Sequence, residues 1–290
     1  MNYQLIKELG SGSFGTTYLA VDQEGNQYAI KSISVERVKM FGMSVEEIHK
    51  EIDTLIAINN KMPPEYAQYV IKYYESFSEF TEYGEFINIV MEYAEGITME
   101  KYVVELKEAP VIGELWPIML QLMTGLEYIH KAGYAHRDIK PGNIMISDSG
   151  QIKYIDFGFA CRNYCSMFKC TTDCGNKAGT TIFMPPEIFD SRTEKSLKNS
   201  KAHDVWSLCC VFYQLTGGQN SFPFVFNPKM TEKEFIASIM SQIYVEPVYT
   251  KDDGRTNIFI DTVTKFNINV RPTVKMMRKI FVDNILATVF

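Results

Sequence analysis

The chain has 290 residues, of which 46% are hydrophobic and 22% charged, with a formal net charge of -6 at pH 7. This composition is typical of a globular protein and argues against a disordered chain. Lysine and arginine are scattered along an acidic sequence, which argues against a nucleic-acid-binding groove.

The N-terminal residues lack the apolar core of a signal peptide. The longest apolar-rich stretch, around 116–129, is too short and too polar to span a bilayer. We therefore expect a soluble protein, cytoplasmic or otherwise intracellular, and take a monomer as the default. Six cysteines are present, and without a secretory signal a disulfide framework is improbable.

Alternating apolar and polar residues in the first ninety positions predict antiparallel strands. The predicted strands cover 4–9, 16–21, 28–33, 70–77 and 86–93. A turn around 24–26 joins the second strand to the third.

A helix is predicted over 45–58, between the third and fourth strands. Ser44 followed by Glu47 forms a capping-box pattern, and isoleucine and leucine recur after it at helical spacing. Beyond residue 96 the apolar spacing predicts helices around 118–129, 205–215, 235–243, 258–266 and 274–286. A short apolar strand is predicted at 152–155. A β-rich part followed by a helical part predicts an α+β fold with two lobes.

The glycines Gly10, Gly12 and Gly15 form a GxGxxG pattern, which alone also suits an ordinary hairpin loop. A dinucleotide-binding fold requires a helix directly after the glycines. Here a strand follows, and the Gly-Lys-Ser/Thr ending of a Walker loop is absent. The remaining interpretation is a strand-turn-strand loop that covers phosphates, with Phe14 at its tip shielding them from water.

Lys31 lies near the middle of the third predicted strand. Glu47 and Glu51 share a face of the following helix because they are four residues apart. We favour Glu51 as the partner of Lys31, with Glu47 as the alternative. Such a pair would hold the ammonium group toward phosphate oxygens.

The stretch HRDIKPGN, residues 136–143, combines a carboxylate, a cation and a carboxamide. Asp138 could accept a proton from a hydroxyl group, and Lys140 could neutralise charge on a transferring phosphoryl group. Asn143, together with Asp156 of the later DFG triplet, offers oxygen atoms suited to Mg²⁺.

These motifs occur in an order that resembles a eukaryotic-type serine/threonine protein kinase domain. The resemblance also includes GTTIFMPPE at 179–187, HDVWSL at 203–208 and NVRPT at 269–273, and it covers residues 4 to about 285. It implies one bilobal kinase domain over 1–290, with an N-lobe over about 1–90, a hinge over about 91–96 and a C-lobe over about 97–290. It also implies ATP and Mg²⁺, or Mn²⁺ in its place, and a protein substrate that carries Ser or Thr.

The resemblance assigns Asp138 as catalytic base, with Lys140, Asn143, Lys31 and Glu51 completing the catalytic set. It assigns Mg²⁺ to Asn143 and Asp156. The ATP-binding residues that it implies are Leu9, Gly10, Ser11, Gly12, Ser13, Phe14, Gly15, Thr16, Thr17, Ala29, Lys31, Met91, Glu92, Ala94 and Met145. Thr17 stands where the family usually has valine, so we expect a small loss in ATP binding.

The resemblance implies further structural roles. Leu55, Tyr73, His136 and Phe157 resemble the stacked side chains that join the lobes of an active kinase. Glu187 and Arg271 resemble a buried ion pair, Asp204 resembles a brace beneath the catalytic loop, and Thr180 resembles the threonine that hydrogen-bonds Asp138 and Lys140. The last of these residues, together with Lys140, is typical of serine/threonine rather than tyrosine kinases.

The segment from Asp156 to Glu187 is longer than in compact members of the family. In relatives, the arginine that corresponds to Arg137 binds a phosphate group on this segment. The candidate phosphorylation sites here are Ser166, Thr171 and Thr172. Alternatively, an acidic residue such as Asp173 pairs with Arg137 without phosphorylation. The segment holds four cysteines that could bind Zn²⁺ or remain as reduced thiols, namely Cys161, Cys165, Cys170 and Cys174; their spacing is wider than structural zinc sites prefer. Cys209 and Cys210 lie in an apolar helix and are expected in the core.

Two alternatives to an active protein kinase stay open at this point. A pseudokinase or scaffold would bind nucleotide without efficient transfer, although the usual loss of a catalytic residue is absent here. A small-molecule kinase of related fold would usually lack the GTTIFMPPE segment and the lysine at position 140.

Overall fold

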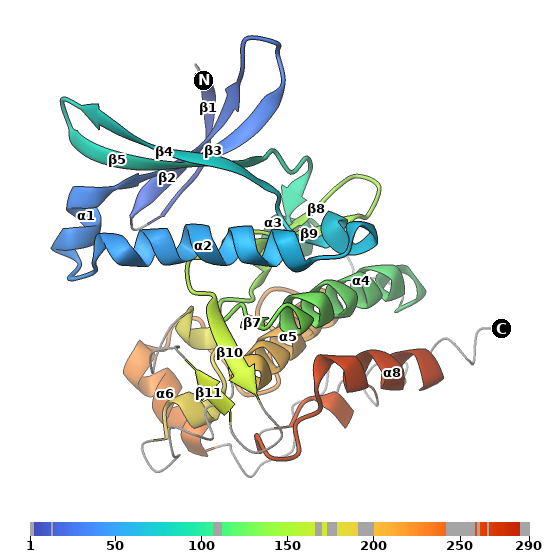
Figure 1. The fold of residues 1–290 in the computed structure, drawn as a ribbon. Helices are drawn as coiled ribbons and strands as arrows, with labels where there is room; N and C mark the ends of the chain where they lie inside the picture. Colours follow the sequence, from blue (N-terminus) through green and yellow to red (C-terminus); the bar gives the residue numbers. More distant parts are fainter. Residues whose placement is uncertain are drawn as a thin grey trace. The chain divides into compact units, whose positions relative to one another are not determined.

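Five antiparallel strands form the sheet of the N-terminal part of the chain in the computed structural model (Figure 1). The strands lie side by side in the order β1-β2-β3-β5-β4. Their bounds are β1 Gln4–Ser11, β2 Gly15–Val21, β3 Gln27–Ser34, β4 Tyr73–Thr81 and β5 Gly84–Glu92. All five strands were predicted, but the fourth starts at Tyr73 instead of residue 70. Val70 and Ile71 are buried, so their apolar character resembles a strand although they precede the regular ladder.

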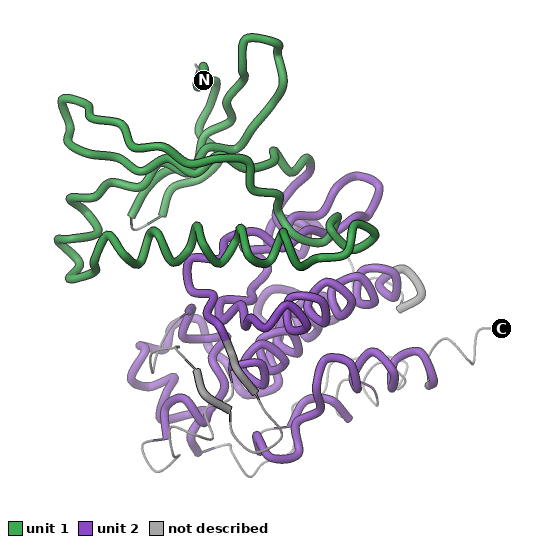
Figure 2. The backbone as a smooth tube through the Cα atoms, in the orientation of Figure 1, with its two compact units in different colours: residues 1–95 green, residues 96–290 purple. Residues whose placement is uncertain are grey.

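The structure describes residues 3–12, 14–106, 112–165, 170–172, 179–190, 200–241, 259, 262–265 and 267–284. The chain divides into two compact units, Met1–Glu95 and Gly96–Phe290 (Figure 2). The first contains the five-stranded sheet, and the second contains most of the helices.

One face of the sheet packs on helix α2, Val45–Lys61. Ile87 and Ile89 alternate along β5, so both point to the same face and are buried with Ile48 and Ile52 of the helix. The backbone N–H of Ser44 donates to Glu47 Oε2 at 3.0 Å, as the capping-box pattern predicts.

Two short elements of this unit were not predicted. Helix α1, Val35–Met40, begins where the Ser34 hydroxyl accepts a hydrogen bond from the N–H of Arg37. The 3₁₀ helix η1, Pro64–Tyr69, follows α2. Each has six residues, too few for a periodic pattern to be distinguished from a loop.

The second unit contains five described helices with assigned bounds and several short strands. The helices are α3 Met99–Glu105, α4 Ile112–Lys131, α5 Ser200–Gly217, α6 Glu232–Ser241 and α8 Val274–Asn284. The strands are β6 Ile97–Thr98, β7 Tyr134–Ala135, β8 Ile144–Ile146, β9 Ile152–Tyr154, β10 Cys161–Cys165 and β11 Cys170–Thr172. The 3₁₀ helices are η2 Pro141–Asn143, η3 Thr181–Phe183 and η4 Pro186–Ile188.

The predicted apolar face of α4 is confirmed, because Ile118, Leu122, Leu126 and Ile129 are all buried. Helix α5 differs from its prediction of one apolar face, because almost every residue from Ser200 to Thr216 is buried. A helix covered on all sides occupies the centre of a core and needs no polar face. Much of the helix predicted at 258–266, and the ends of those predicted at 235–243 and 274–286, lie outside the described residues.

The sheet β6-β8-β9 positions the segment that carries the HRDIKPGN motif. Its last residues form η2 and lead directly into β8. Within the described part of the chain, no helix has the length and apolar character needed to cross a membrane.

Candidate active site

The Gly-rich loop connects β1 to β2. The Phe14 carbonyl accepts a hydrogen bond from Ser34 N–H at 3.0 Å, and the Phe14 ring meets the Phe41 ring edge-on at 5.6 Å between centroids. The loop is thereby attached to the connection between α1 and α2. Sequence reasoning did not find the Phe41 contact, because α1 was not predicted.

The three glycines of the loop have different surroundings. A Cβ at Gly15 would overlap the backbone carbonyl of Ser32, whereas a Cβ at Gly10 would meet nothing within 4 Å. At Gly12 it would meet only a backbone oxygen at 3.8 Å. Gly15 is therefore required by the protein's own packing, and Gly10 and Gly12 are not. Ser13, predicted with them, lies outside the described residues.

Lys31 and Glu51 form the ion pair favoured by the sequence. Lys31 Nζ lies 2.6 Å from Glu51 Oε1, and both side chains are largely buried. Glu47, the alternative, accepts its hydrogen bond from Ser44 at the start of the helix. The pair fixes the lysine ammonium in the middle of the sheet.

Other predicted nucleotide-binding residues of the first unit lie on its strands or just after them. Ala29 of β3 is directly opposite Met91 of β5 in the ladder. Glu92 closes β5 and donates its N–H to the carbonyl of Lys72 at 2.9 Å, and Ala94 follows it. Met145, in the second unit, lies in β8.

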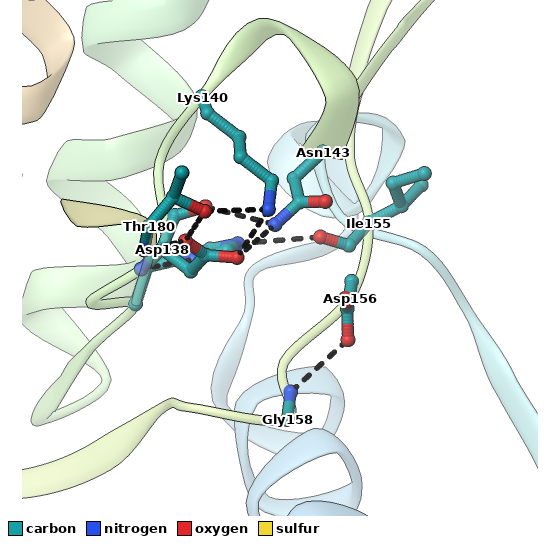
Figure 3. Close-up of polar contacts among 8 residues, drawn as sticks. Asp138, Lys140, Asn143, Ile155, Asp156, Gly158 and Thr180 are labelled. Carbon is teal, nitrogen blue, oxygen red and sulfur yellow. Dashed lines mark hydrogen bonds and ion pairs between the residues drawn. The ribbon is translucent and has the colours of Figure 1, made fainter. Parts of the chain in front are cut away.

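Asp138 is the centre of the polar cluster in the second unit (Figure 3). Its Oδ1 accepts hydrogen bonds from the N–H and the hydroxyl of Thr180, at 2.8 and 2.9 Å. Its Oδ2 accepts from Asn143 Nδ2 at 2.8 Å and lies 3.0 Å from Lys140 Nζ. The carboxylate is buried, and these donors fix its direction.

Lys140 and Thr180 are joined as the sequence resemblance implies. Lys140 Nζ donates to Thr180 Oγ1 at 2.7 Å, and the same hydroxyl donates to Asp138. The peptide of Thr180 approaches closely because Gly179 precedes it with φ of 99°. A Cβ at Gly179 would overlap the carbonyl of Arg137, so only glycine allows this approach.

Asn143 is held by its side-chain amide nitrogen and by its backbone carbonyl. Its Nδ2 donates to the carbonyl of Asp138 at 2.9 Å as well as to the carboxylate, and its own carbonyl accepts from Ile155 N–H at 3.0 Å. Because the amide nitrogen faces Asp138, the side-chain oxygen points to the other side (Figure 3).

Two non-glycine residues near the cluster adopt positive φ. Arg137 has φ of 67° and Asp156 has φ of 57°. Such left-handed conformations cost about 1 kcal/mol or more outside glycine and persist where the surroundings impose them. Arg137 directly precedes Asp138, and Asp156 begins the DFG triplet. Asp156 Oδ1 accepts a hydrogen bond from Gly158 N–H at 3.3 Å.

Asp204 of α5 braces the start of the HRDIKPGN segment from inside the core. The side chain is fully buried and accepts from His136 N–H at 2.8 Å and Arg137 N–H at 2.7 Å. His130 Nε2 lies 2.8 Å from Asp204 Oδ2. Burial alone would raise the pKa of Asp204, but the hydrogen bond and the charge of His130 bring the net shift of the pKa downward.

His130 was missed by the sequence reasoning. It lies in the last turn of α4, four residues after buried Leu126, so it continues the apolar face of that helix. A polar residue on an otherwise apolar face predicts a buried partner, and this signal could have revealed the contact with Asp204.

His203 gives a prediction for the pH dependence of stability. Burial lowers the pKa of this histidine from 6.5 to about 4, so below pH 6.5 the unfolded chain takes up a proton that the folded chain refuses. Above pH 6.5 the histidine is neutral in both states and has no effect on the unfolding free energy. As the pH falls from 6.5 toward 4, the unfolding free energy decreases by up to about 1.4 kcal/mol per pH unit. In urea unfolding at several pH values, His203→Gln is expected to show a shallower loss of stability than the wild type over this window.

The matched control is His49→Gln, at an exposed position of α2, which is expected to keep the wild-type pH dependence. Equal slopes for His203→Gln and the wild type would contradict the prediction.

Glu187 and Arg271 form a buried bidentate ion pair. Arg271 Nη1 and Nη2 lie 2.7 and 3.0 Å from the two carboxylate oxygens. The guanidinium also donates to the carbonyls of Lys265 and Ala202 and lies 5.3 Å from the ring centre of Trp206. The pair attaches η4 to the region before α8.

The other structural residues implied by the resemblance lie in separate units. His136 and Phe157 pack with ring centroids 4.8 Å apart in the second unit. Leu55 is buried and Tyr73 is partly buried in the first.

The cysteine-rich segment contains the β10–β11 hairpin, in which Cys165 is opposite Cys170. Cys161 is disulfide-bonded, which differs from the expectation of reduced thiols, and sulfur in a disulfide offers no thiolate to zinc. Cys174, Ser166 and Asp173 lie outside the described residues.

Cys209 and Cys210 are unpaired, buried thiols, as expected for core residues, and burial raises the pKa of Cys209 to about 11.

Comparison with known proteins identifies the family. The sequence model of the protein kinase domain matches residues 3–281. Serine/threonine-protein kinase pakH of Dictyostelium discoideum is 31% identical over 219 residues, which are 75% of this chain and 38% of that protein. MAP kinase kinase kinase wis4 of Schizosaccharomyces pombe is 28% identical over 280 residues, which are 88% of this chain and 18% of that protein.

A third relative, MAP kinase kinase kinase SSK2 of Saccharomyces cerevisiae, is 30% identical over 249 residues, or 76% of this chain and 15% of that protein. The chain thus spans well under half the length of these relatives. Since the match to the family model covers nearly all of the sequence and its motifs occupy the geometry described above, the chain belongs to the protein kinase domain family.

Proposed function

We propose that this chain transfers the γ-phosphoryl group of ATP to serine or threonine hydroxyl groups of proteins. The observation that carries the proposal is the arrangement around Asp138. Its buried carboxylate is held in one direction by Thr180, Asn143 and Lys140, in which it can orient a hydroxyl and accept its proton.

In the proposed reaction the substrate hydroxyl oxygen forms a bond to the γ-phosphorus, and the bond from that phosphorus to the bridging oxygen of ADP breaks. The hydroxyl proton passes to Asp138. Lys140, 3.0 Å from that carboxylate, neutralises charge on the transferring group. Fixed charges of this kind stabilise a transition state without reorganising during the reaction.

The first unit would supply the contacts to the nucleotide. Lys31, held by Glu51, is assigned to the phosphates, and the Gly-rich loop covers them with backbone atoms. Ala29 and Met145 are assigned to the apolar sandwich around the adenine ring, and Met91 to the gatekeeper position of the family. The backbone of Glu92 and Ala94 is assigned to hydrogen bonds with adenine, and Leu9, Ser11, Thr16 and Thr17 complete the proposed ATP site.

Protein kinases generally use Mg²⁺ with ATP, and the donor set here fits a hard cation. The Asn143 amide is oriented with its nitrogen toward Asp138, which leaves its oxygen as the ligand, and Asp156 adds a carboxylate. Bound Mg²⁺ would neutralise phosphate charge, and Mn²⁺ could replace it. Zn²⁺ bound by all four of Cys161, Cys165, Cys170 and Cys174 is not proposed, because Cys161 is disulfide-bonded.

Preference for serine and threonine is supported by Lys140 and its bond to Thr180, the combination that resembles that class. The relative pakH is itself named a serine/threonine-protein kinase. No such support exists for a small-molecule acceptor.

The test is transfer from γ-labelled ATP to a basic and an acidic generic protein substrate, followed by phosphoamino-acid analysis. Labelled phosphoserine or phosphothreonine supports the proposal. Nucleotide binding without transfer favours the pseudokinase interpretation, and labelled phosphotyrosine alone overturns the assigned specificity.

Asp156→Ala is expected to reduce transfer by at least about a hundredfold, because it removes one of the two proposed metal ligands. The loss should be partly offset when Mg²⁺ is raised in the assay. The measurement is kcat against Mg²⁺ concentration, with exposed Asp148→Ala as the control. Near wild-type transfer at low Mg²⁺ would contradict the assigned role.

A further inference from the structure

The hairpin formed by β4 and β5 has an unusual sequence over residues 73–86, YYESFSEFTEYGEF. It combines aromatic residues with the glutamates Glu75, Glu79, Glu82 and Glu85, and it contains no lysine or arginine. The proposed phosphoryl-transfer reaction uses none of these side chains except partly buried Tyr73. The composition therefore needs another explanation.

Strand β4 is an edge of the five-stranded sheet (Figure 1). Among the described residues its ladder partner is β5 alone. Alternate residues of an edge strand direct N–H and C=O groups away from the sheet, where another extended chain can pair with them. With nine residues, β4 is long enough to pair with a segment of similar length.

The edge strand and its tip expose large aromatic side chains. Phe80 is 79% exposed and Tyr83 is 78% exposed, while Phe77 is 37% exposed. Protected edge strands are usually very short or carry lysine or proline, whereas β4 has nine residues and neither of these. Aromatic groups concentrated on an open edge are instead typical of a surface that another molecule covers.

Three successive outward positions of β4 alternate acid, aromatic and acid. In the ladder Glu75 is opposite Val90, Phe77 opposite Asn88 and Glu79 opposite Phe86, so the three β4 side chains share the sheet face that is turned away from α2. Tyr3 links the first two, since its hydroxyl donates to Glu75 Oε1 at 2.6 Å and its ring stacks on Phe77 at 6.3 Å.

The acidic groups of this row lack cationic partners among the described residues. Glu75 accepts from the neutral Tyr3 hydroxyl, and Glu79 accepts from the neutral Asn88 amide at 3.4 Å. The negative charge of the row is therefore hydrogen-bonded but not neutralised within the described part of the chain.

We propose that β4 is a docking edge for an extended, basic segment of a partner protein. The segment would pair with β4 as an added strand, which supplies backbone hydrogen bonds. Its side chains would alternate basic, apolar and basic opposite Glu75, Phe77 and Glu79, because directly opposed pairs of this kind stabilise a sheet.

A second copy of the same chain is a poorer occupant. Pairing β4 with β4 would bring two rows of unneutralised glutamates onto one sheet face, and like charges opposite one another destabilise a ladder. The charge of the row thus selects a basic strand and rejects self-association.

The test uses a fluorescent nonapeptide of threonines with lysine at its third and seventh positions and valine at its fifth. Binding is measured by fluorescence anisotropy to wild type, to Glu79→Lys and to Glu65→Lys. Glu65 is exposed in η1 of the same unit, so the control variant has the same net charge as the test variant. A peptide methylated on its backbone nitrogens tests the added-strand geometry.

The proposal expects saturable binding to the wild type that weakens at least about tenfold in Glu79→Lys and by far less in Glu65→Lys. The methylated peptide should not bind, and hydrogen exchange of β4 amides should slow when the unmodified peptide is present. No binding up to about 1 mM peptide overturns the proposal. Equal weakening in both variants would show attraction to net charge alone, and dimerisation of the wild-type chain through β4 would show that a second copy is the occupant.

Discussion

Replacing Asp138 by asparagine is expected to lower kcat for phosphoryl transfer to protein about a thousandfold. Asparagine has nearly the same shape but cannot take the hydroxyl proton. Its amide nitrogen would also face donors, since Thr180 donates to one carboxylate oxygen and Asn143 and Lys140 approach the other. Initial rates at saturating ATP and protein substrate measure the effect.

Two comparisons separate lost chemistry from lost folding. Nucleotide binding by Asp138→Asn should remain within a few-fold of wild type, and its unfolding transition should stay cooperative. Asp148→Asn, at an exposed position between β8 and β9, carries the same chemical change and should keep wild-type rates. A rate for Asp138→Asn within tenfold of the wild type would reject the base assignment.

Glu187→Gln is expected to lower the unfolding free energy by about 3 kcal/mol. The substitution keeps the size of the side chain but leaves the Arg271 guanidinium, whose side chain is 0% exposed, without its carboxylate. A buried cation that loses its counter-charge costs far more than a surface ion pair contributes. Urea unfolding, followed by tryptophan fluorescence, gives the change from the transition midpoint and slope.

The control for this variant is Glu105→Gln on α3. Glu105 lies 3.6 Å from Lys101, and both side chains are more than half exposed, so the expected change is below about 1 kcal/mol. If the two glutamine variants lose similar stability, burial does not determine the strength of the Glu187 pair.

Sequence patterns predicted the helices and strands that are long enough to show a periodic pattern. They also predicted side-chain clusters that form within one short segment. The capping box of α2 and the buried face of α4 follow from spacing alone. Asp138, Lys140 and Asn143 lie within six residues, so a short loop necessarily brings them near one another. The Lys31–Glu51 pair required more, because the sequence favoured Glu51 but left Glu47 as an alternative that only the orientation of α2 resolves.

Contacts between distant segments escaped the sequence for a physical reason. His130 meets Asp204 across 74 positions, and nothing local in either segment encodes that meeting. Phe41 reaches Phe14 only because a helix of six residues turns the chain back toward the loop. The strands β6, β7 and β8 were missed because two or three residues cannot display a period of two, whereas β9 was predicted from the apolar stretch that precedes the DFG triplet.

The unequal surroundings of the three loop glycines have a consequence for inherited variation. A mutation that places a side chain at position 15 would strain the sheet and destabilise the fold. Less folded protein should then accumulate, so we expect the mutation to act through a reduced amount of protein. Alleles at positions 10 and 12 meet no such obstacle and would yield abundant, folded protein impaired only in what the loop binds. Such a folded but impaired protein could still bind the molecules that the rest of its surface recognises. It would then compete with the unmutated protein, and selection would act on that competition.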